Sequence, residues 1–443
     1  MAQLAGNEES GFAVPRRLDF TSELFAPTLT HLLGDDIVAS ARVLRSSKDF
    51  QQTLARHFYR GDLPADNLAR AMRANRSLGR ELDAALRQGV GPNTGVAAEV
   101  ADFVRSAEQI PDFIDRKKVT EGGRVFRSKL DLFGLITYGL PVGIYLQGMV
   151  PAITMAVLFT NRPTQAPATI EQALARKESK RRGIVRVLET FKWFNAVAEK
   201  GAGDLYTEEF RENCRIRLVH AHIRAAISGH QKEWNYQPPL AWDESVLGVP
   251  MSAADGAIVV ATIMVTMLGM RRHLQKPISD EELDALNHWV NYLSFLQGVP
   301  EELLCQSWEE TATKLAAFIL CMDPDTYHSP MRSFMTELQD LGLGRGLFGR
   351  FRPLARLLDG VGAAALTRVF DDELRAHFGI RRASAGDRAV YALLRSGVSL
   401  MNQAAGFSSS LNRRLDGQTV KLWRTVMPEA ERMLSRLHGR VVE

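Results

Sequence analysis

The chain has little of several features that mark common protein classes, beginning with cysteine. Only three of its 443 residues are cysteine, namely Cys214, Cys305 and Cys321, and no two of them stand at CxxC spacing. Because their number is odd and their spacing wide, they argue against a disulfide framework or a zinc site and favour buried thiols in a reducing compartment. The net charge of +4 is small for this length, so charge alone does not indicate a nucleic-acid-binding protein.

Segments for export or for crossing a membrane are not evident either. Residues 1–17 contain two glutamates and no basic run followed by an apolar core, so we expect no signal peptide and a cytoplasmic protein. The apolar stretch 132–160 is interrupted by Pro141 and Pro151, and the stretch 256–270 is shorter than the ~20 residues that a transmembrane helix needs. We interpret both stretches as buried helices of a large core; a peripheral membrane contact is the alternative.

Common catalytic and nucleotide-binding motifs are missing as well, since the chain contains no GxSxG, Walker A or HExxH pattern. One GxGxxG pattern occurs at residues 344–349. A dinucleotide site requires a strand before this pattern, whereas residues 336–341 have the pattern of a helix end. We therefore interpret it as a chance match in a loop.

Helical periodicity dominates the chain, and we find no sustained alternation of the kind that predicts strands. With 45% hydrophobic and 24% charged residues, the composition is that of a soluble globular protein. We predict an all-α fold, with helices at residues 36–46, 48–59, 64–88, 95–109, 118–139, 141–159, 184–199, from 206 onward, and 256–270. Asp112 and Ser279 are expected to cap helices, and Pro353 and Pro428 to stop them.

No repeat and no clear linker composition divides the chain into independent domains. A break is expected at Asp323-Pro324-Asp325. We therefore predict an N-terminal extension at residues 1–49, a helical core at 50–322 and a C-terminal helical region at 323–443.

One stretch of the helix that begins near Tyr206 has an unusual pattern. At helical spacing His220 shares a face with three isoleucines and with Arg217 and Arg224. A neutral imidazole there could be an axial haem ligand, with the arginines near propionate carboxylates. The same pattern also fits a core histidine with two arginines that extend to solvent. The pattern alone does not decide between these two interpretations.

A metal site shared by His220 and His222 is excluded by helix geometry. Residues two apart on a helix are rotated by about 200°, so the two imidazoles face nearly opposite ways. This argues against a zinc cluster and leaves a single histidine ligand.

The preceding helix carries Arg186 and Thr190 at i and i+4, with Trp193 and Val197 on the same face and Glu189 one step aside. Buried arginine requires a paired anion, so both helices predict anionic groups nearby. Those groups could be haem propionates, or simply Glu189 and Glu212.

These motifs resemble those of the latex-clearing protein family of rubber oxygenases and the related MpaB-type oxygenases. Arg217-x-x-His220-x-x-x-Arg224 matches the core of the family signature, and Arg186-x-x-Glu189-Thr190 stands at the spacing of the family's Arg-x-x-Lys-Thr element. Two further segments, 61–66 (Gly-Asp-Leu-Pro-Ala-Asp) and 110–115 (Ile-Pro-Asp-Phe-Ile-Asp), resemble family segments. The likeness covers roughly residues 50–320.

The resemblance implies a globin-like helical core that holds one b-type haem. His220 would be the proximal axial ligand to the iron. Arg217 and Arg224 would support the haem and its propionates, and Arg186 and Thr190 would line the pocket. The activity implied is insertion of dioxygen into a carbon–carbon double bond of an isoprenoid.

The chain departs from the family pattern at two positions. Glu189 stands where the family has a lysine that can be a distal haem ligand, so it could ligate iron, act as an acid or base, or point away. The family's catalytic glutamate falls near Ile170, and one insertion would align it with Glu171, which we expect to be a general base. Without an export signal, an intracellular lipid-like or terpenoid alkene is a more plausible substrate than a solid extracellular polymer.

The sequence therefore predicts a haem b-dependent oxygenase that acts with dioxygen on a hydrophobic, unsaturated small molecule, and no nucleic-acid partner. Two alternatives remain: a non-catalytic haem-binding sensor or carrier with the same fold, and a helical interaction protein that has lost the cofactor.

Overall fold

The computed structural model describes residues 14–91, 95–139, 141–146, 189–190, 192–198, 203–227, 242–327, 332, 339 and 352–442. These residues are helical or lie in turns, and extended backbone pairs among them only in an isolated bridge between Leu18 and Met322. The all-α prediction is therefore confirmed.

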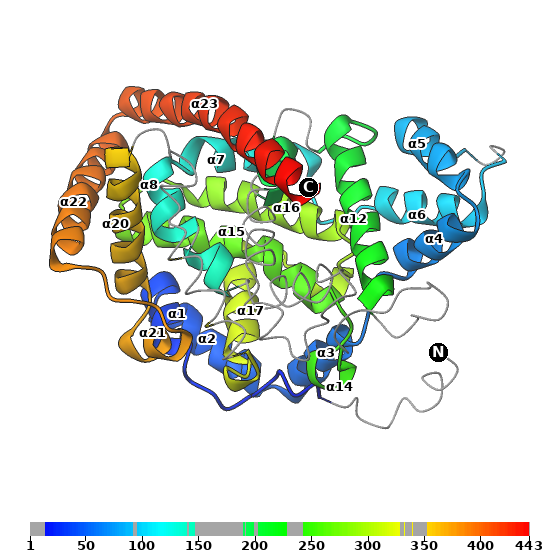
Figure 1. Cartoon of the computed structure of the whole chain (residues 1–443), viewed down its shortest axis with the longest axis horizontal. Helices are drawn as coiled ribbons and strands as arrows, with labels where there is room; N and C mark the ends of the chain where they lie inside the picture. Colours follow the sequence, from blue (N-terminus) through cyan, green and yellow to red (C-terminus); the bar gives the residue numbers. More distant parts are fainter. Residues whose placement is uncertain are drawn as a thin grey trace.

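The helices follow one another along the chain as α1 (Ala26–Leu33), α2 (Asp35–Ser46), α3 (Lys48–Phe58), α4 (Leu63–Ala74), α5 (Leu78–Gln88), α6 (Ala98–Glu108), α7 (Arg116–Lys129), α8 (Leu132–Gly134), the π-helical turns η1 (Leu135–Gly139) and η2 (Pro141–Leu146), α12 (Glu208–Ile227), α14 (Glu244–Leu247), α15 (Ala253–His273), α16 (Asp280–Leu296), the short 3₁₀ turn η3 (Glu301–Leu303), α17 (Trp308–Leu320), the 3₁₀ turn η4 (Asp325–Tyr327), α20 (Arg352–Val369), α21 (Asp372–Phe378), α22 (Ala385–Phe407) and α23 (Ser409–Val442). Figure 1 shows α15 and α16 in the middle, α4–α6 at one side and α20–α22 at the other.

The central helix α15 begins with a capping box in which Ser252 and Asp255 satisfy each other's backbone N–H groups. It is the one helix of the described residues that is long and apolar enough to cross a membrane, and 89% of its most apolar window is buried inside the protein. Helices α1, α3, α16 and α17 pack around it. The predicted helix 256–270 is confirmed, and its burial is that of a core helix.

The closest helix packing joins α7 to α16. A Cβ added at Gly122 would stand 2.2 Å from the backbone oxygen of Ala285, so only glycine allows the two backbones to approach this closely. Beside this contact Phe126 packs on Trp289, with ring centroids 4.9 Å apart. Helices α7 and α16 thus form one rigid wall of the core.

The C-terminal helix α23 is fixed to the same wall by a buried cation. The Nζ atom of Lys129, on α7, lies 3.0 Å from a carboxylate oxygen of Asp416 and 3.3 Å from one of Glu282. The indole N–H of Trp423 donates to the backbone oxygen of Leu130 at 2.8 Å. Since lone buried charges are costly, this three-helix ion pair holds α23 in place.

Two of the predicted helices are interrupted. Residues 64–88 form α4 and α5 instead of one helix, because Asn75 is extended and its side-chain oxygen accepts from the backbone N–H of Ser77. The predicted helix 118–139 ends at Lys129, because the Asp131 side chain accepts from the N–H of Gly134 and starts the next turn.

The predicted caps and stops have mixed outcomes. Ser279 caps α16 in a capping box, as predicted. Asp112 does not cap α7; Asp115 does, accepting from the N–H of Lys117 at 2.8 Å. Pro353 stands at the start of α20, and Pro428 lies inside α23, where the chain stays helical. The loop at 344–349 and the predicted site residues Glu171 and Arg186 lie outside the described residues, and the domain boundaries stay a prediction.

Candidate functional site

One cavity has a volume of about 900 Å³, a size typical of sites for cofactors and small ligands. It lies between α12, the start of α4, the first turns of α15, the loop after α16 and the helical residues 192–197. Its lining includes Gly61, Asp62, Glu189, Thr190, Lys192, Trp193, Val197, Glu208, Glu209, Glu212, Ile216, Val219, His220, Ile223, Arg224, Ser252, Asp255, Val259, Val260 and Gly298.

Helix α12 presents His220 to this cavity. Ile216, Val219 and Ile223, at helical spacing from the histidine, line the cavity with it. His222 is not among the lining residues, and burial lowers its pKa. The predicted separation of the two histidines is therefore found in the structure. Among the described residues no group of three or more His, Cys, Asp or Glu side chains is arranged to hold a metal ion.

Arg217 lies under the cavity in a buried ion pair with Asp62. Its Nη2 donates to Oδ1 of Asp62 at 2.8 Å and its Nε donates to Oδ2, while the two side chains are only 4% and 7% exposed. Burial alone would raise the pKa of Asp62, but the charge and hydrogen bonds of Arg217 outweigh it, so this pKa is lowered. The pair is buried, and Asp62 also lines the cavity.

Arg224 has a partner one turn further along α4. Its Nε donates to Oδ1 of Asp66 at 2.9 Å, and its Nη1 donates to the backbone oxygen of Met251 at 2.7 Å. Burial is the largest effect on Asp66 and raises its pKa despite Arg224. Unlike Arg217, Arg224 is one of the cavity-lining residues.

These pairs correct one expectation. The sequence offers Glu189 and Glu212 as protein anions for the arginines, but Asp62 and Asp66 pair with Arg217 and Arg224, and Glu212 lies 3.6 Å from Arg215. The reason is that Asp62 caps α4, which packs against α12. The signal was present in the segment 61–66, although nothing local linked it to an arginine 155 residues away. Whether the arginines also contact a cofactor stays a prediction.

Gly298 packs directly against the Arg217–Asp62 ion pair. It follows α16 with a φ of +84°, and a Cβ there would stand 2.1 Å from Oδ2 of Asp62 and 3.2 Å from Nε of Arg217. Both the backbone conformation and the space therefore require glycine. The loop after α16 is therefore in close contact with the Arg217–Asp62 ion pair, which joins α12 to the start of α4.

A third buried ion pair was not expected from the sequence. Arg17 donates from Nη2 to Oδ1 of Asp255 at 2.8 Å, and its guanidinium lies 3.6 Å from the ring centroid of Phe58. Asp255 lines the cavity, so the N-terminal segment helps to fix the first turn of α15. The two residues are 238 positions apart, and no sequence pattern links them.

The opposite wall carries the second group of predicted site residues. Thr190, Trp193 and Val197, which were predicted to share a helix face, line the cavity, and so does Glu189, which was predicted one step aside from that face. The indole nitrogen of Trp193 is buried without a hydrogen-bond partner in the described part of the chain. It is a donor that a polar group of a ligand can satisfy.

The lining residues fit a haem. The cavity has branched apolar walls for the macrocycle, one histidine that can be an axial ligand, and the cations Arg224 and Lys192 for carboxylates. Glu208, Glu209 and Glu212 add an acidic portion from the first turns of α12.

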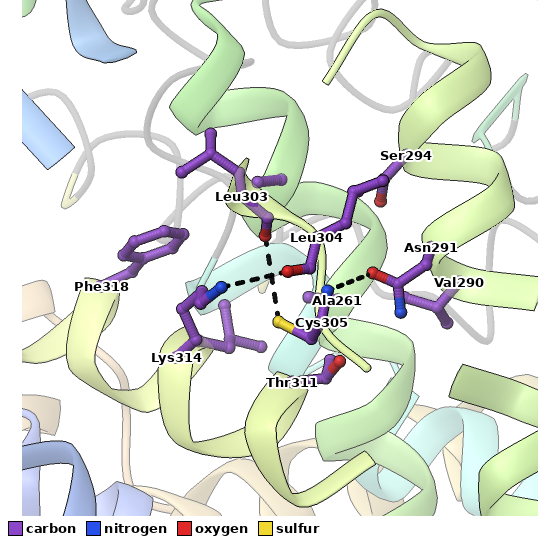
Figure 2. Close-up of a pocket in the computed structure, with 12 residues that line it drawn as sticks. Ala261, Val290, Asn291, Ser294, Leu303, Leu304, Cys305, Thr311, Lys314 and Phe318 are labelled. Atoms are coloured by element: carbon purple, nitrogen blue, oxygen red, sulfur yellow. Dashed lines mark hydrogen bonds between the residues drawn. The ribbon is translucent and has the colours of Figure 1, made fainter. Parts of the chain in front are cut away.

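A second cavity, shown in Figure 2, is of a different kind. Its volume is about 20 Å³, which is room for one water molecule. Around it the N–H of Cys305 donates to Asn291 at 2.8 Å, and Lys314 donates to the backbone oxygen of Leu304 at 3.1 Å. Burial raises the pKa of the Cys305 thiol. These contacts hold the turn between α16 and α17, and we assign the small cavity to structure.

Comparisons with known proteins place the chain. The family model described as "ER-bound oxygenase mpaB/B'/Rubber oxygenase, catalytic domain" matches residues 127–400, further toward the C-terminus than the resemblance seen in the sequence. A solved structure titled "Structure of Latex Clearing Protein LCP in the closed state" shares the fold, with a TM-score of 0.51 and 16% identity over 82% of this chain and 90% of that one. No curated protein matches. Since the family model matches more than half of its length, the chain belongs to the MpaB and rubber oxygenase family.

Proposed function

We propose that the protein is a haem b-dependent oxygenase that uses dioxygen on a hydrophobic, unsaturated substrate of the isoprenoid or lipid-like class. The observation that carries the proposal is the position of His220 on the apolar part of a cavity of about 900 Å³. Membership of an oxygenase family supports an enzyme. The three free, buried cysteines support a reducing compartment such as the cytoplasm.

In this proposal His220 would hold the haem iron through its imidazole, and the two arginines of its helix would have different tasks. Arg217 is buried with Asp62 and positions α12 without reaching the cavity lining. Arg224 and Lys192 both line the cavity, where their positive charges would attract carboxylates of the cofactor. When bound, the haem supplies the redox-active iron that oxidation by dioxygen requires.

The remaining tasks belong to side chains of the cavity wall. Ile216, Ile223 and Val259 exclude water and hold an alkene by apolar contact. Thr190 and Trp193 are donors for polar groups at the wall. Glu189 also lines the cavity, and its carboxylate would hold or move a proton there. For Glu171 and Arg186 we keep the roles that the resemblance implies, general base and pocket residue.

Two measurements test the proposal. The purified protein is expected to show a Soret band that changes on reduction, and His220→Ala to remove it while His222→Ala, on the far side of the same helix, keeps it. Oxygen uptake is then followed with a panel of isoprenoid and unsaturated lipid alkenes. Haem binding without uptake for any alkene would contradict the oxygenase and favour a sensor or carrier; absence of haem would contradict both.

A further inference from the structure

Helix α22 carries a continuous apolar face that is exposed to solvent. Its exposed large apolar side chains are Val390, Leu393, Leu394, Leu400, Met401 and Phe407. They recur at helical spacing and share one face with Gly397 and Ala404. Leu393, Leu400 and Phe407 are 75%, 66% and 95% exposed, whereas a soluble surface helix normally turns such residues inward.

The opposite face of α22 is fixed to the protein. Tyr391 stacks on Phe133, with ring centroids 5.9 Å apart. Asn402 donates to the backbone oxygen of Leu274 at 2.9 Å, and Arg395 donates to that of His273 at 3.2 Å. The orientation of the helix is thereby set, so the apolar face is held outward. Figure 1 shows α22 at the edge of the molecule, outside α20.

Exposed cations stand at both ends of this face. Arg413 and Arg414 follow its C-terminal end, and Arg381, Arg382 and Arg388 lie at its N-terminal end, where Arg382 pairs with the exposed Asp372 at 2.7 Å. The two carboxylates between residues 381 and 424, Asp387 and Asp416, are half-buried. Phe407 stands at the corner between α22 and α23, and Arg413 and Arg414 follow it within two turns.

We propose that the outward face of α22, with the corner at Phe407, docks on the surface of an anionic lipid bilayer. An apolar helix face bordered by cations is the arrangement that lies in the headgroup region of such a membrane. A second copy of the chain fits less well, because a two-fold pairing of α22 would bring the same cations against one another. None of these residues lines the large cavity, so the inference does not depend on the proposed function.

Co-sedimentation with vesicles tests the proposal. The full-length protein is expected to pellet with vesicles of phosphatidylcholine mixed with phosphatidylglycerol, and far less with phosphatidylcholine alone. The triple variant Leu393→Ser, Leu400→Ser, Phe407→Ser should bind at least about tenfold more weakly, because it loses the inserted apolar groups. Arg413→Ser with Arg414→Ser should weaken binding to the anionic vesicles by more than about tenfold, at roughly fivefold per cation.

The control variant is Val43→Ser. Val43 is an apolar side chain on α2 that is 76% exposed and lies outside the proposed face. This variant should bind vesicles as strongly as the parent does. Circular dichroism verifies that every variant is folded. Failure of the parent to bind anionic vesicles, or equal binding by the triple variant, would overturn the proposal. So would a concentration-dependent dimer in mass photometry that the triple variant abolishes, since the occupant would then be a second copy.

Discussion

Helices α12 and α22 both present apolar side chains to something other than protein, and they differ in how charge is arranged beside them. On α12 the apolar residues line a cavity between several helices, and Arg217 and Arg224 are held by Asp62 and Asp66. On α22 the apolar residues are open to solvent, and the cations nearby are exposed. Paired, buried charge fixes the geometry of a site for one ligand, whereas exposed cations suit an extended anionic surface.

The largest effect on stability is expected at the buried pair of α12. Asp62→Asn leaves the guanidinium of Arg217 buried without a counter-charge, which should lower the free energy of unfolding by about 3–5 kcal/mol. Urea unfolding measures this change, and haem content should fall with it. Adding Arg217→Met removes the uncompensated charge and should restore part of the loss. A loss below about 1 kcal/mol for Asp62→Asn alone would show that the pair does not hold α12.

Replacing one glycine near α12 and one in α22 by alanine should affect stability differently. Gly298→Ala forces a side chain onto Asp62 at a φ of +84° and should destabilise by about 1–3 kcal/mol. Gly397→Ala lies in α22, where a Cβ meets nothing within 4 Å, and should be neutral or stabilise by up to about 1 kcal/mol. Thermal unfolding compares the two; equal shifts would contradict the packing described for Gly298.

Acid should destabilise the α22 side more than the α12 side, because two stacked histidines with lowered pKa values lie near α22 and one, His222, lies on α12. Burial lowers the pKa of His31 from 6.5 to about 4; this ring stacks on His273, whose backbone oxygen accepts from Arg395 of α22. A lowered histidine pKa stabilises the fold fully above 6.5, and that contribution is lost as the pH falls from 6.5 to about 4. The pKa of Asp62 is lowered too, but for a carboxyl this contribution persists above about 3.9 and is lost only below it.

Hydrogen exchange at pH 7 and pH 5 measures this difference. Protection should fall most in α1, the end of α15 and α22, where burial lowers the pKa of both His31 and His273, and fall less in α12, where burial lowers the pKa of His222. His31→Gln should remove part of the change between these two pH values. A uniform loss of protection, or none on the α22 side, would contradict the assignment.

The smallest effect on stability is expected on the open face of α22. Leu393→Ser, Leu400→Ser and Phe407→Ser remove side chains that the folded protein exposes, so each should change the free energy of unfolding by no more than about 0.5 kcal/mol. Urea unfolding of the three single variants verifies this. Losses as large as that of Asp62→Asn would mean that the face packs against protein.

Features that depend on contacts within one helix could be predicted from the sequence. The Ser279 cap of α16 and the separation of His220 from His222 follow from spacing within one helix. The partners of Arg217 and Arg17 lie 155 and 238 positions away, and only the tertiary packing of α4 and α15 reveals them. The division of residues 64–88 depends on the side chain of Asn75, because a local hydrogen bond there outweighs helix propensity.

The haem content of three purified proteins tests the central claim most directly. The parent and His222→Ala are expected to carry haem, with a Soret band in the absorption spectrum. His220→Ala should retain its helical circular dichroism and carry none, because it loses the only histidine that lines the cavity among the described residues. Full haem retention by folded His220→Ala, or loss in His222→Ala alone, would contradict the assignment of His220 as the axial ligand.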